Sequence, residues 1–426
     1  MWKKQPNLLP ILIAVTLFSL PLYVVRCSYF SFCVSPVPFT LLEVFILITF
    51  GYWLYLQIKA NSLKQKLLNF QNKIPKIIQV FIFIFLLSGL IGSFISPDIR
   101  AGLGMYKAYF LEGFLLFIVI FDYLQTTKNY KLIVWSLVSS ALWVAVVAIF
   151  NQLLNYNPGN PAEFLDRGRV SAVYTTSNAI GLLLGPMTLL MFGYFLSLKN
   201  TEKSILKEKN LALISLIILV LGIWVSGSRG AFLGILAGFL FCSGFILYSK
   251  LSDKVRKVIT RVFNIGLLVF SAVIFLFFIN ISFFAKNPPI ISTNFQSSFK
   301  SRLCLWEGAV KIIKDRPFFG SGLSGFEKVH NEFRTCSREN SIYPHNIFLN
   351  FWTEVGIFGL ISFIGICGFL FFKLIEERLN FLNVGIASIF VVILFHGLVD
   401  VPFFKNDLSI QFWTLLALGL YKLKEN

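Results

Sequence analysis

The sequence predicts an all-α polytopic membrane protein of about twelve transmembrane helices, with one long external loop between spans nine and ten. Of the 426 residues, 56% are hydrophobic and only 14% are charged, which leaves too little polar surface for a soluble domain. Apolar runs such as LALISLIILVLGIWV recur along the chain, and crossing a bilayer core takes roughly 20 such residues. A transmembrane β-barrel would instead alternate apolar and polar residues over runs of roughly ten. The sequence therefore favours spanning helices.

The distribution of lysine and arginine predicts the orientation of these spans. The expected spans begin near Leu8, Pro38, Ile77, Leu103, Leu132, Ser177, Leu211, Arg229, Val262, His345, Asn383 and Leu408. Basic residues gather in alternate loops, such as residues 59–76, and are sparse in the opposite short loops. By the positive-inside rule, the basic loops and both termini are expected in the cytoplasm. The net charge of +18 then reflects orientation in the membrane, and we expect no nucleic-acid partner.

Residues 285–344 contain no spanning run, so we expect an external subdomain there, within a single membrane domain covering residues 1–426. Its segment SSFKSRLCLWEGAVKIIKDRPFFGSG predicts an amphipathic helix near residues 298–315. Leu305, Ala309 and Ile312 would share one face, and Pro317 would end the helix. We expect this helix to lie against the membrane surface.

Two arginines and a lysine are candidates for binding an anion at the outer face. Arg229 lies in WVSGSRGAFLG, a turn too short to be a solvated loop, so its guanidinium either reaches the lipid headgroups or binds phosphate oxygens. Arg302 and Trp306 are one helical turn apart and share a face. Ordinary surface pairing explains them, or Arg302 joins Arg229 to hold one diphosphate. Lys107, near the outer end of the fourth span, is a further candidate for phosphate.

Two histidines are candidates for a functional role at the same outer face. His345 lies in YPHNIFLNFWTEVG, where the external segment meets the tenth span, and a neutral histidine can accept a proton from a hydroxyl. A structural role at the helix start is the alternative. His396 and Asp400 are four residues apart on one helix face, where they either brace two helices or contact substrate. Asn346 and Arg169 are possible supporting residues.

The sequence lacks several motifs of soluble enzymes. It has no Walker A loop, no DxD, no HExxH and no nucleophile elbow, which argues against nucleotide-driven chemistry. We expect no metal site and no cofactor. Four cysteines are expected on the outer side, and pairing among them would allow three connectivities. They are Cys27, Cys33, Cys304 and Cys336.

Five motifs stand in a fixed order from Gly168 onward. They are GRVSAVYTTSNAIGLLL, SGSRGAFLGILAG, RLCLWEGAVKIIKDRPFFGSGLSGF, YPHNIFLNFWTEVGIFGL and HGLVDVPFF. This ordered set, with a long external loop before PHN, resembles the O-antigen ligase and polymerase superfamily of bacterial membrane glycosyltransferases. One departure is that the PN-type segment of the sixth span reads TTSN, so Asn178 lacks its proline.

The resemblance implies an architecture of the GT-C type in the bacterial inner membrane and a reaction on the periplasmic side. The donor would be a glycan on undecaprenyl diphosphate, transferred with inversion and without a metal ion. Arg229 and Arg302 would bind the diphosphate, and His345 would be the essential histidine. The favoured prediction is O-antigen ligation to the lipid A core. Polymerisation onto a second lipid-linked repeat unit and transfer to protein hydroxyls are alternatives, and a small-molecule or ion transporter is an alternative of another class.

Overall fold

The computed structural model describes residues 8–26, 39–198, 203–252, 255, 293–333, 341–376 and 380–423. In these segments every regular element is helical, and one isolated bridge pairs Arg26 with Thr40. The predicted all-α class is confirmed. Eight helices in the described segments are long and apolar enough to cross a membrane. The predicted total of twelve stays a prediction, because the ninth span, expected near Val262, lies outside the described residues.

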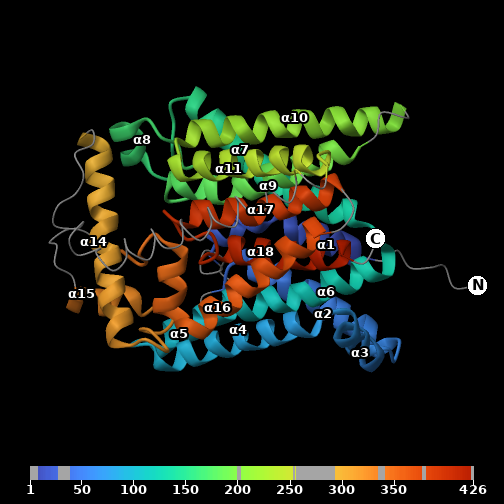
Figure 1. The fold of residues 1–426 in the computed structure, drawn as a ribbon, viewed down its shortest axis with the longest axis horizontal. Helices are drawn as coiled ribbons and strands as arrows, with labels where there is room; N and C mark the ends of the chain where they lie inside the picture. Colours follow the sequence, from blue (N-terminus) through green and yellow to red (C-terminus); the bar gives the residue numbers. More distant parts are fainter. Residues whose placement is uncertain are drawn as a thin grey trace, which may run out of the picture.

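The long helices run side by side along the longest axis of the molecule (Figure 1). They are α2 (Leu41–Lys59), α4 (Lys76–Ile95), α7 (Tyr130–Leu153), α9 (Ser177–Ser197), α10 (Lys203–Ser226), α11 (Arg229–Ser249) and α16 (Ile347–Glu376). One further span is continuous through α5 (Ile99–Met105), the π-helical turn η3 (Tyr106–Leu111) and α6 (Glu112–Thr127). Shorter helices complete the bundle: α1 (Leu9–Phe18), η1 (Leu20–Val24), α17 (Phe381–Gly397) and α18 (Asn406–Lys422).

Helix α9 lies at the centre of one half of the bundle, and its side chains are almost all buried against α7, α10, α11 and α17. Small residues let the backbones approach closely, as in many membrane helix pairs. A Cβ added to Gly193 of α9 would lie 2.5 Å from the Cα of Gly385 on α17. An aromatic cluster fills the other half, in which Phe351 stacks on Phe363 with ring centroids 4.3 Å apart. The core therefore fixes the helix ends that carry the polar residues.

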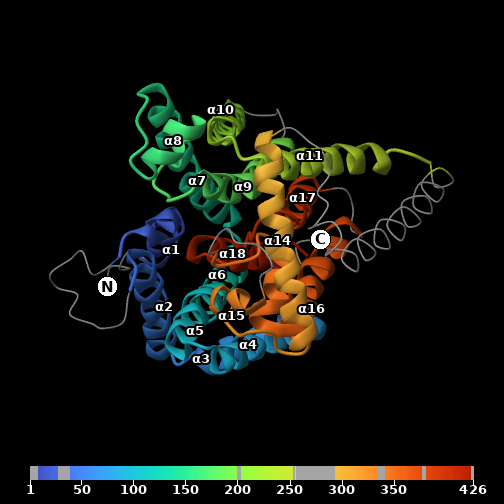
Figure 2. The same ribbon diagram turned by 90° about the vertical axis from the view of Figure 1, so that its left-hand side faces the viewer.

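Both ends of the bundle carry additional helices. Helix α14 (Thr293–Asp315) crosses one end, with α8 (Pro161–Arg167) and α15 (Phe326–Phe333) at the same end (Figure 1). The view onto that end shows α14 running across the ends of the other helices (Figure 2). Helix α3 (Leu63–Lys73) lies at the opposite end.

The apolar face of α14 packs on protein. Leu305, Ala309 and Ile312 are buried in one cluster with Phe326 and Val329 of α15. The apolar stripe of this helix therefore finds partners on α15 and α16. The expectation that the helix lies against the membrane surface stays a prediction. The helix extends over Thr293–Asp315, where one was expected near residues 298–315.

The glycine-rich segment after α14 is inserted against a break in α16. Gly356 has a φ of 77°, and the next amide, that of Ile357, donates to the carbonyl of Phe318 over 3.1 Å. An oxygen of the Glu354 carboxyl accepts from the backbone amide of Phe326 at 3.1 Å, so this buried side chain caps α15. The PFFGSGLSGF motif is thus a structural tie between α14, α15 and α16.

Candidate functional site

His345 is held at the point where the external segment enters α16. It has a left-handed backbone, with a φ of 50°, which is uncommon outside glycine and is frequent at functional sites. Trp306 of α14 donates to the carbonyl of Pro344 over 2.9 Å. The Asn346 side chain accepts from the amides of Phe348 and Leu349 at 3.0 and 3.1 Å and so caps α16. These contacts fix the backbone on both sides of His345.

The Asp400 carboxylate lies against the imidazole of His345. Nδ1 of His345 is 3.4 Å from Oδ1 of Asp400, which also accepts from the amide of Val401 at 3.0 Å. Burial opposes ionisation of Asp400, but its hydrogen bond to His345 and nearby positive charges outweigh burial and hold the pKa of the carboxyl below its usual range. Asp400 is therefore a carboxylate that orients Nδ1. The His345 side chain is 30% exposed, so Nε2 is the nitrogen left for a substrate.

A chain of side chains supports this pair from α9. Asn178 donates from Nδ2 to Oδ2 of Asp400 over 3.2 Å, and it accepts from Nη2 of Arg169 at 2.7 Å. Arg169 also donates to the carbonyl of Ser226 over 2.9 Å and pairs with Glu163 at 3.3 Å. Arg169 and Asn178 therefore act on His345 through Asp400. This contact gives Asn178 a role, although its motif lacks the expected proline.

The two candidate arginines approach the loop that carries Asp400. Nε of Arg302, which is half-buried on α14, donates to the carbonyl of Val399 over 3.1 Å. Arg229 is exposed at the start of α11, and a Cβ on its neighbour Gly230 would lie 3.0 Å from the Val399 side chain. Arg229, Arg302 and His345 thus belong to elements that meet around residues 398–401.

Two of the candidates have other surroundings. Lys107 pairs with Glu43 at 3.1 Å and with Glu112 at 3.8 Å, so its charge is neutralised by protein groups. His396 is buried, and a Cβ on Gly230 would lie 2.7 Å from its Cδ2 atom. Within the described segments no hydrogen bond joins His396 to Asp400, whose carboxylate binds His345 and Asn178 instead. His396 therefore supports the packing of α11 against α17.

Among the described residues, no group of three or more histidine, cysteine or acidic side chains is arranged to hold a metal ion. The residues that sequence reasoning missed at this site are Tyr343, whose ring lies edge-on to that of His345 at 5.0 Å, and Asn178 in its contact with Asp400. Tyr343 is only two positions before His345, but sequence cannot show that their rings meet.

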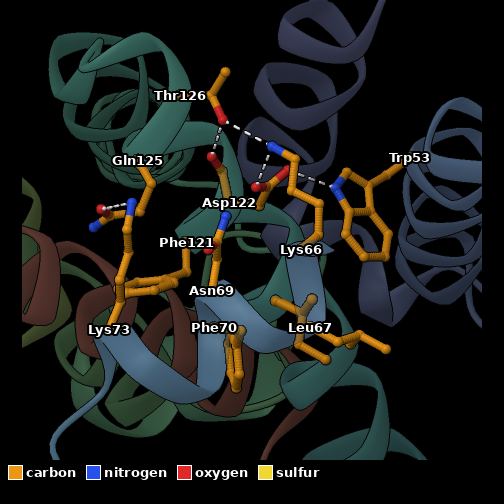
Figure 3. A pocket seen from close by; sticks show the side chains of 11 residues that line it. Trp53, Lys66, Leu67, Asn69, Phe70, Lys73, Phe121, Asp122, Gln125 and Thr126 are labelled. Carbon is orange, nitrogen blue, oxygen red and sulfur yellow. Dashed lines mark hydrogen bonds and ion pairs between the residues drawn. The ribbon is translucent and has the colours of Figure 1, made fainter. Parts of the chain in front are cut away.

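A cavity of about 110 Å³ lies at the other end of the bundle, between α3, α2 and α6 (Figure 3). The Lys66 ammonium donates to Asp122 at 2.7 Å, and Lys73 donates to Gln125 at 2.9 Å. Trp53 donates to the same Asp122 carboxylate over 3.0 Å. These contacts hold α3 against α2 and α6. The cavity lacks a histidine and its charged groups are paired with protein, so it is not the candidate site.

Comparison with known proteins agrees with the site at the α14 end. Residues 214–364 match a protein-family model described as O-antigen ligase. This match supports the resemblance to the O-antigen ligase and polymerase superfamily. The matched segment contains Arg229, Arg302 and His345. The sequence match and the multi-pass helical fold together support an O-antigen ligase- or polymerase-type function.

A relative that aligns over most of its own length is found in Haemophilus influenzae (strain ATCC 51907 / DSM 11121 / KW20 / Rd). It is described as an uncharacterized protein and is 25% identical over 362 residues. The alignment covers 80% of this chain and 83% of the relative, so the similarity extends well beyond the segment matched by the family.

Proposed function

We propose that this protein transfers a glycan from undecaprenyl diphosphate to an acceptor hydroxyl at the periplasmic face of the bacterial inner membrane. Ligation of O-antigen to the lipid A core is the favoured reaction. The observation that carries the proposal is the partly exposed His345, which is backed by the Asp400 carboxylate and lies beside a loop that two arginines approach. A general base beside two arginine side chains suits a reaction in which a hydroxyl group displaces a diphosphate.

The proposed reaction is a direct displacement. Nε2 of His345 takes the proton from the acceptor hydroxyl while that oxygen bonds to the anomeric carbon of the donor. The bond from this carbon to the diphosphate oxygen breaks, so the configuration inverts. Asp400 stabilises the imidazolium that forms. General base catalysis of this kind typically contributes about 10²- to 10⁴-fold.

Arg229 and Arg302 hold the leaving diphosphate in this scheme. Planar guanidinium groups make paired hydrogen bonds to phosphate oxygens, and their positive charge is placed where negative charge develops. The scheme therefore uses no metal ion. The tie from Arg302 to the carbonyl of Val399, next to Asp400, couples diphosphate binding to the position of the base.

Two observations support placing the α14 end in the periplasm. Cys304 of α14 is disulfide-bonded, and disulfides persist in oxidising compartments. Residues 59–76, at the α3 end, hold five lysines and no acidic residue, as expected of a cytoplasmic loop.

Labelling tests this orientation. In intact cells an impermeant thiol reagent should react with a cysteine replacing Lys300 on α14 and should spare one replacing Lys64 on α3, both of which are exposed positions. A cysteine at Gln296 should behave like the one at Lys300. The opposite pattern would reverse the proposed orientation.

Reconstitution tests the reaction itself. Purified protein in proteoliposomes, given a lipid-linked O-antigen donor and lipid A core, should form glycosylated lipid A core. Longer lipid-linked glycan as the product would instead assign a polymerase. Absence of transfer to either acceptor, together with counterflow uptake of a small solute, would favour a transporter.

A further inference from the structure

Three tyrosines from distant parts of the chain lie around the loop between α17 and α18, which carries Asp400. Tyr23 lies in η1, Tyr109 in η3 and Tyr343 just before α16. All three side chains are partly exposed. Among the described residues, none of their hydroxyl groups has a hydrogen-bond partner, although tyrosine hydroxyls in recessed positions usually find one.

Contacts bring two of these rings close to the start of α18, where Asp407 lies. The Tyr23 ring stacks on that of Tyr174 at 6.0 Å, and the Tyr174 hydroxyl donates to Asp407 over 3.1 Å. The Tyr109 ring lies edge-on to that of Phe404 at 6.3 Å, three positions before Asp407. The Tyr343 ring meets the His345 ring at 5.0 Å, so this tyrosine lies directly beside the base.

The charges in this region differ from those around Arg229 and Arg302. Of the two cations described in this region, Lys107 is paired with Glu43 and Glu112, and Lys405 stands two positions before Asp407 at the start of α18. Asp407 adds a further carboxylate. This region is thus poorly suited to a diphosphate and better suited to an uncharged group with many hydroxyls. Seen from the α14 end, α1, α2 and α5 lie on one side of α14 and α11 lies on the other (Figure 2).

Building on the proposed function, we propose that Tyr23, Tyr109 and Tyr343 form an acceptor subsite, which binds the sugar that carries the attacking hydroxyl. Their hydroxyls bond to hydroxyls of the sugar, and their rings cover its apolar faces. Arg229 and Arg302 receive the diphosphate of the donor on the α11 side. His345 lies between the two, where it reaches the acceptor hydroxyl. This arrangement separates an uncharged acceptor sugar from an anionic diphosphate by charge.

The test replaces each of the three tyrosines by phenylalanine, which removes only a hydroxyl that has no partner in the described structure. Each of Tyr23→Phe, Tyr109→Phe and Tyr343→Phe should raise the KM for lipid A core by roughly 2- to 10-fold, the loss expected for one neutral hydrogen bond. Donor binding and melting temperature should stay at wild-type values. The matched control is Tyr55→Phe, at an exposed position near the C-terminal end of α2, which should leave the KM unchanged.

Binding without reaction separates this proposal from the proposed function. Lipid A core should bind wild-type protein in nanodiscs that hold no donor, and the triple phenylalanine variant should bind it more weakly. Weaker binding of this acceptor by the variant supports the subsite even when wild-type protein transfers no glycan. Unchanged acceptor binding and unchanged KM in all three variants, with active wild-type protein, would overturn the subsite and leave the proposed function in place.

Discussion

The polar clusters at the two ends of the bundle differ in whether groups of the protein satisfy all of their polar side chains. At the α3 end, Lys66 pairs with Asp122 and Lys73 donates to Gln125, so the ammonium groups end on protein acceptors. At the α14 end, the Asp400 carboxylate is fully engaged, but the His345 imidazole is 30% exposed. The three tyrosine hydroxyls beside it have no hydrogen-bond partner in the described segments. The first cluster stabilises helix packing, whereas the second is completed only when a substrate binds.

The comparison also shows that charged residues alone do not identify the functional end of the bundle. Ionised groups near the membrane are costly unless they are paired, and at the α3 end the pairing accounts for them. At the α14 end Arg169 and Asn178 are used to hold Asp400, which in turn faces His345. A chain of groups that ends on an exposed imidazole is an arrangement that packing alone does not require. The following predictions test this difference, beginning with the largest expected effect.

His345→Ala should lower the rate of glycan transfer by about 10²- to 10⁴-fold and leave donor binding unchanged, because it removes a base and not the diphosphate site. Transfer is measured with purified protein and lipid-linked donor, and donor binding is measured separately. His396→Ala is the matched control. It removes a buried histidine at the α11 and α17 contact, so it should lower the melting temperature and preserve the rate per folded molecule. A near wild-type rate of transfer by His345→Ala would show that His345 has a structural role and is not the catalytic base.

Arg229→Lys and Arg302→Lys should each lower transfer by roughly 10- to 100-fold, since a charge-assisted hydrogen bond contributes about 1.5–3 kcal/mol and lysine lacks the planar fork. Lys66→Arg at the α3 end is the control, because arginine can still pair with Asp122. Transfer rates and expression are compared for all three variants. Full activity in both lysine variants would show that the arginines only reach the lipid headgroups.

The smallest expected effect is on stability against pH. The pKa of Asp400 is lower in the folded protein than its usual value of about 4. Its ionised form therefore stabilises the fold above about pH 4, and this contribution is lost as pH falls through the folded pKa. Wild-type protein should melt at a higher temperature than Asp400→Asn at neutral pH, and the gap should narrow as pH falls below about 4. A gap that does not change with pH would mean that the charge of Asp400 does not contribute to stability.

Much of the fold and part of the site could be predicted from sequence. Apolar runs and loop charges are local signals, so they predicted spanning helices, and the apolar periodicity of the RLCLWEGAVKII segment predicted an amphipathic helix. What that helix packs against was missed, because an apolar stripe fits lipid and protein equally well. The contact between Asn178 and Asp400 joins positions 222 apart, and that between His345 and Asp400 joins positions 55 apart. Such pairings depend on tertiary packing, which explains why Asp400 was paired with His396 on spacing alone.

The most direct test of the account is a double-mutant cycle on His345 and Asp400. Because Asp400 acts on the reaction through His345, Asp400→Asn should slow transfer in wild-type protein by about 10²-fold and have almost no effect when His345 is already alanine. The measurement is the transfer rate of the two single variants and the double variant, normalised to folded protein. Equal rates for His345→Ala and the double variant are the result predicted here. A double variant slowed by the product of the two single effects would show that the residues act independently and would contradict the account.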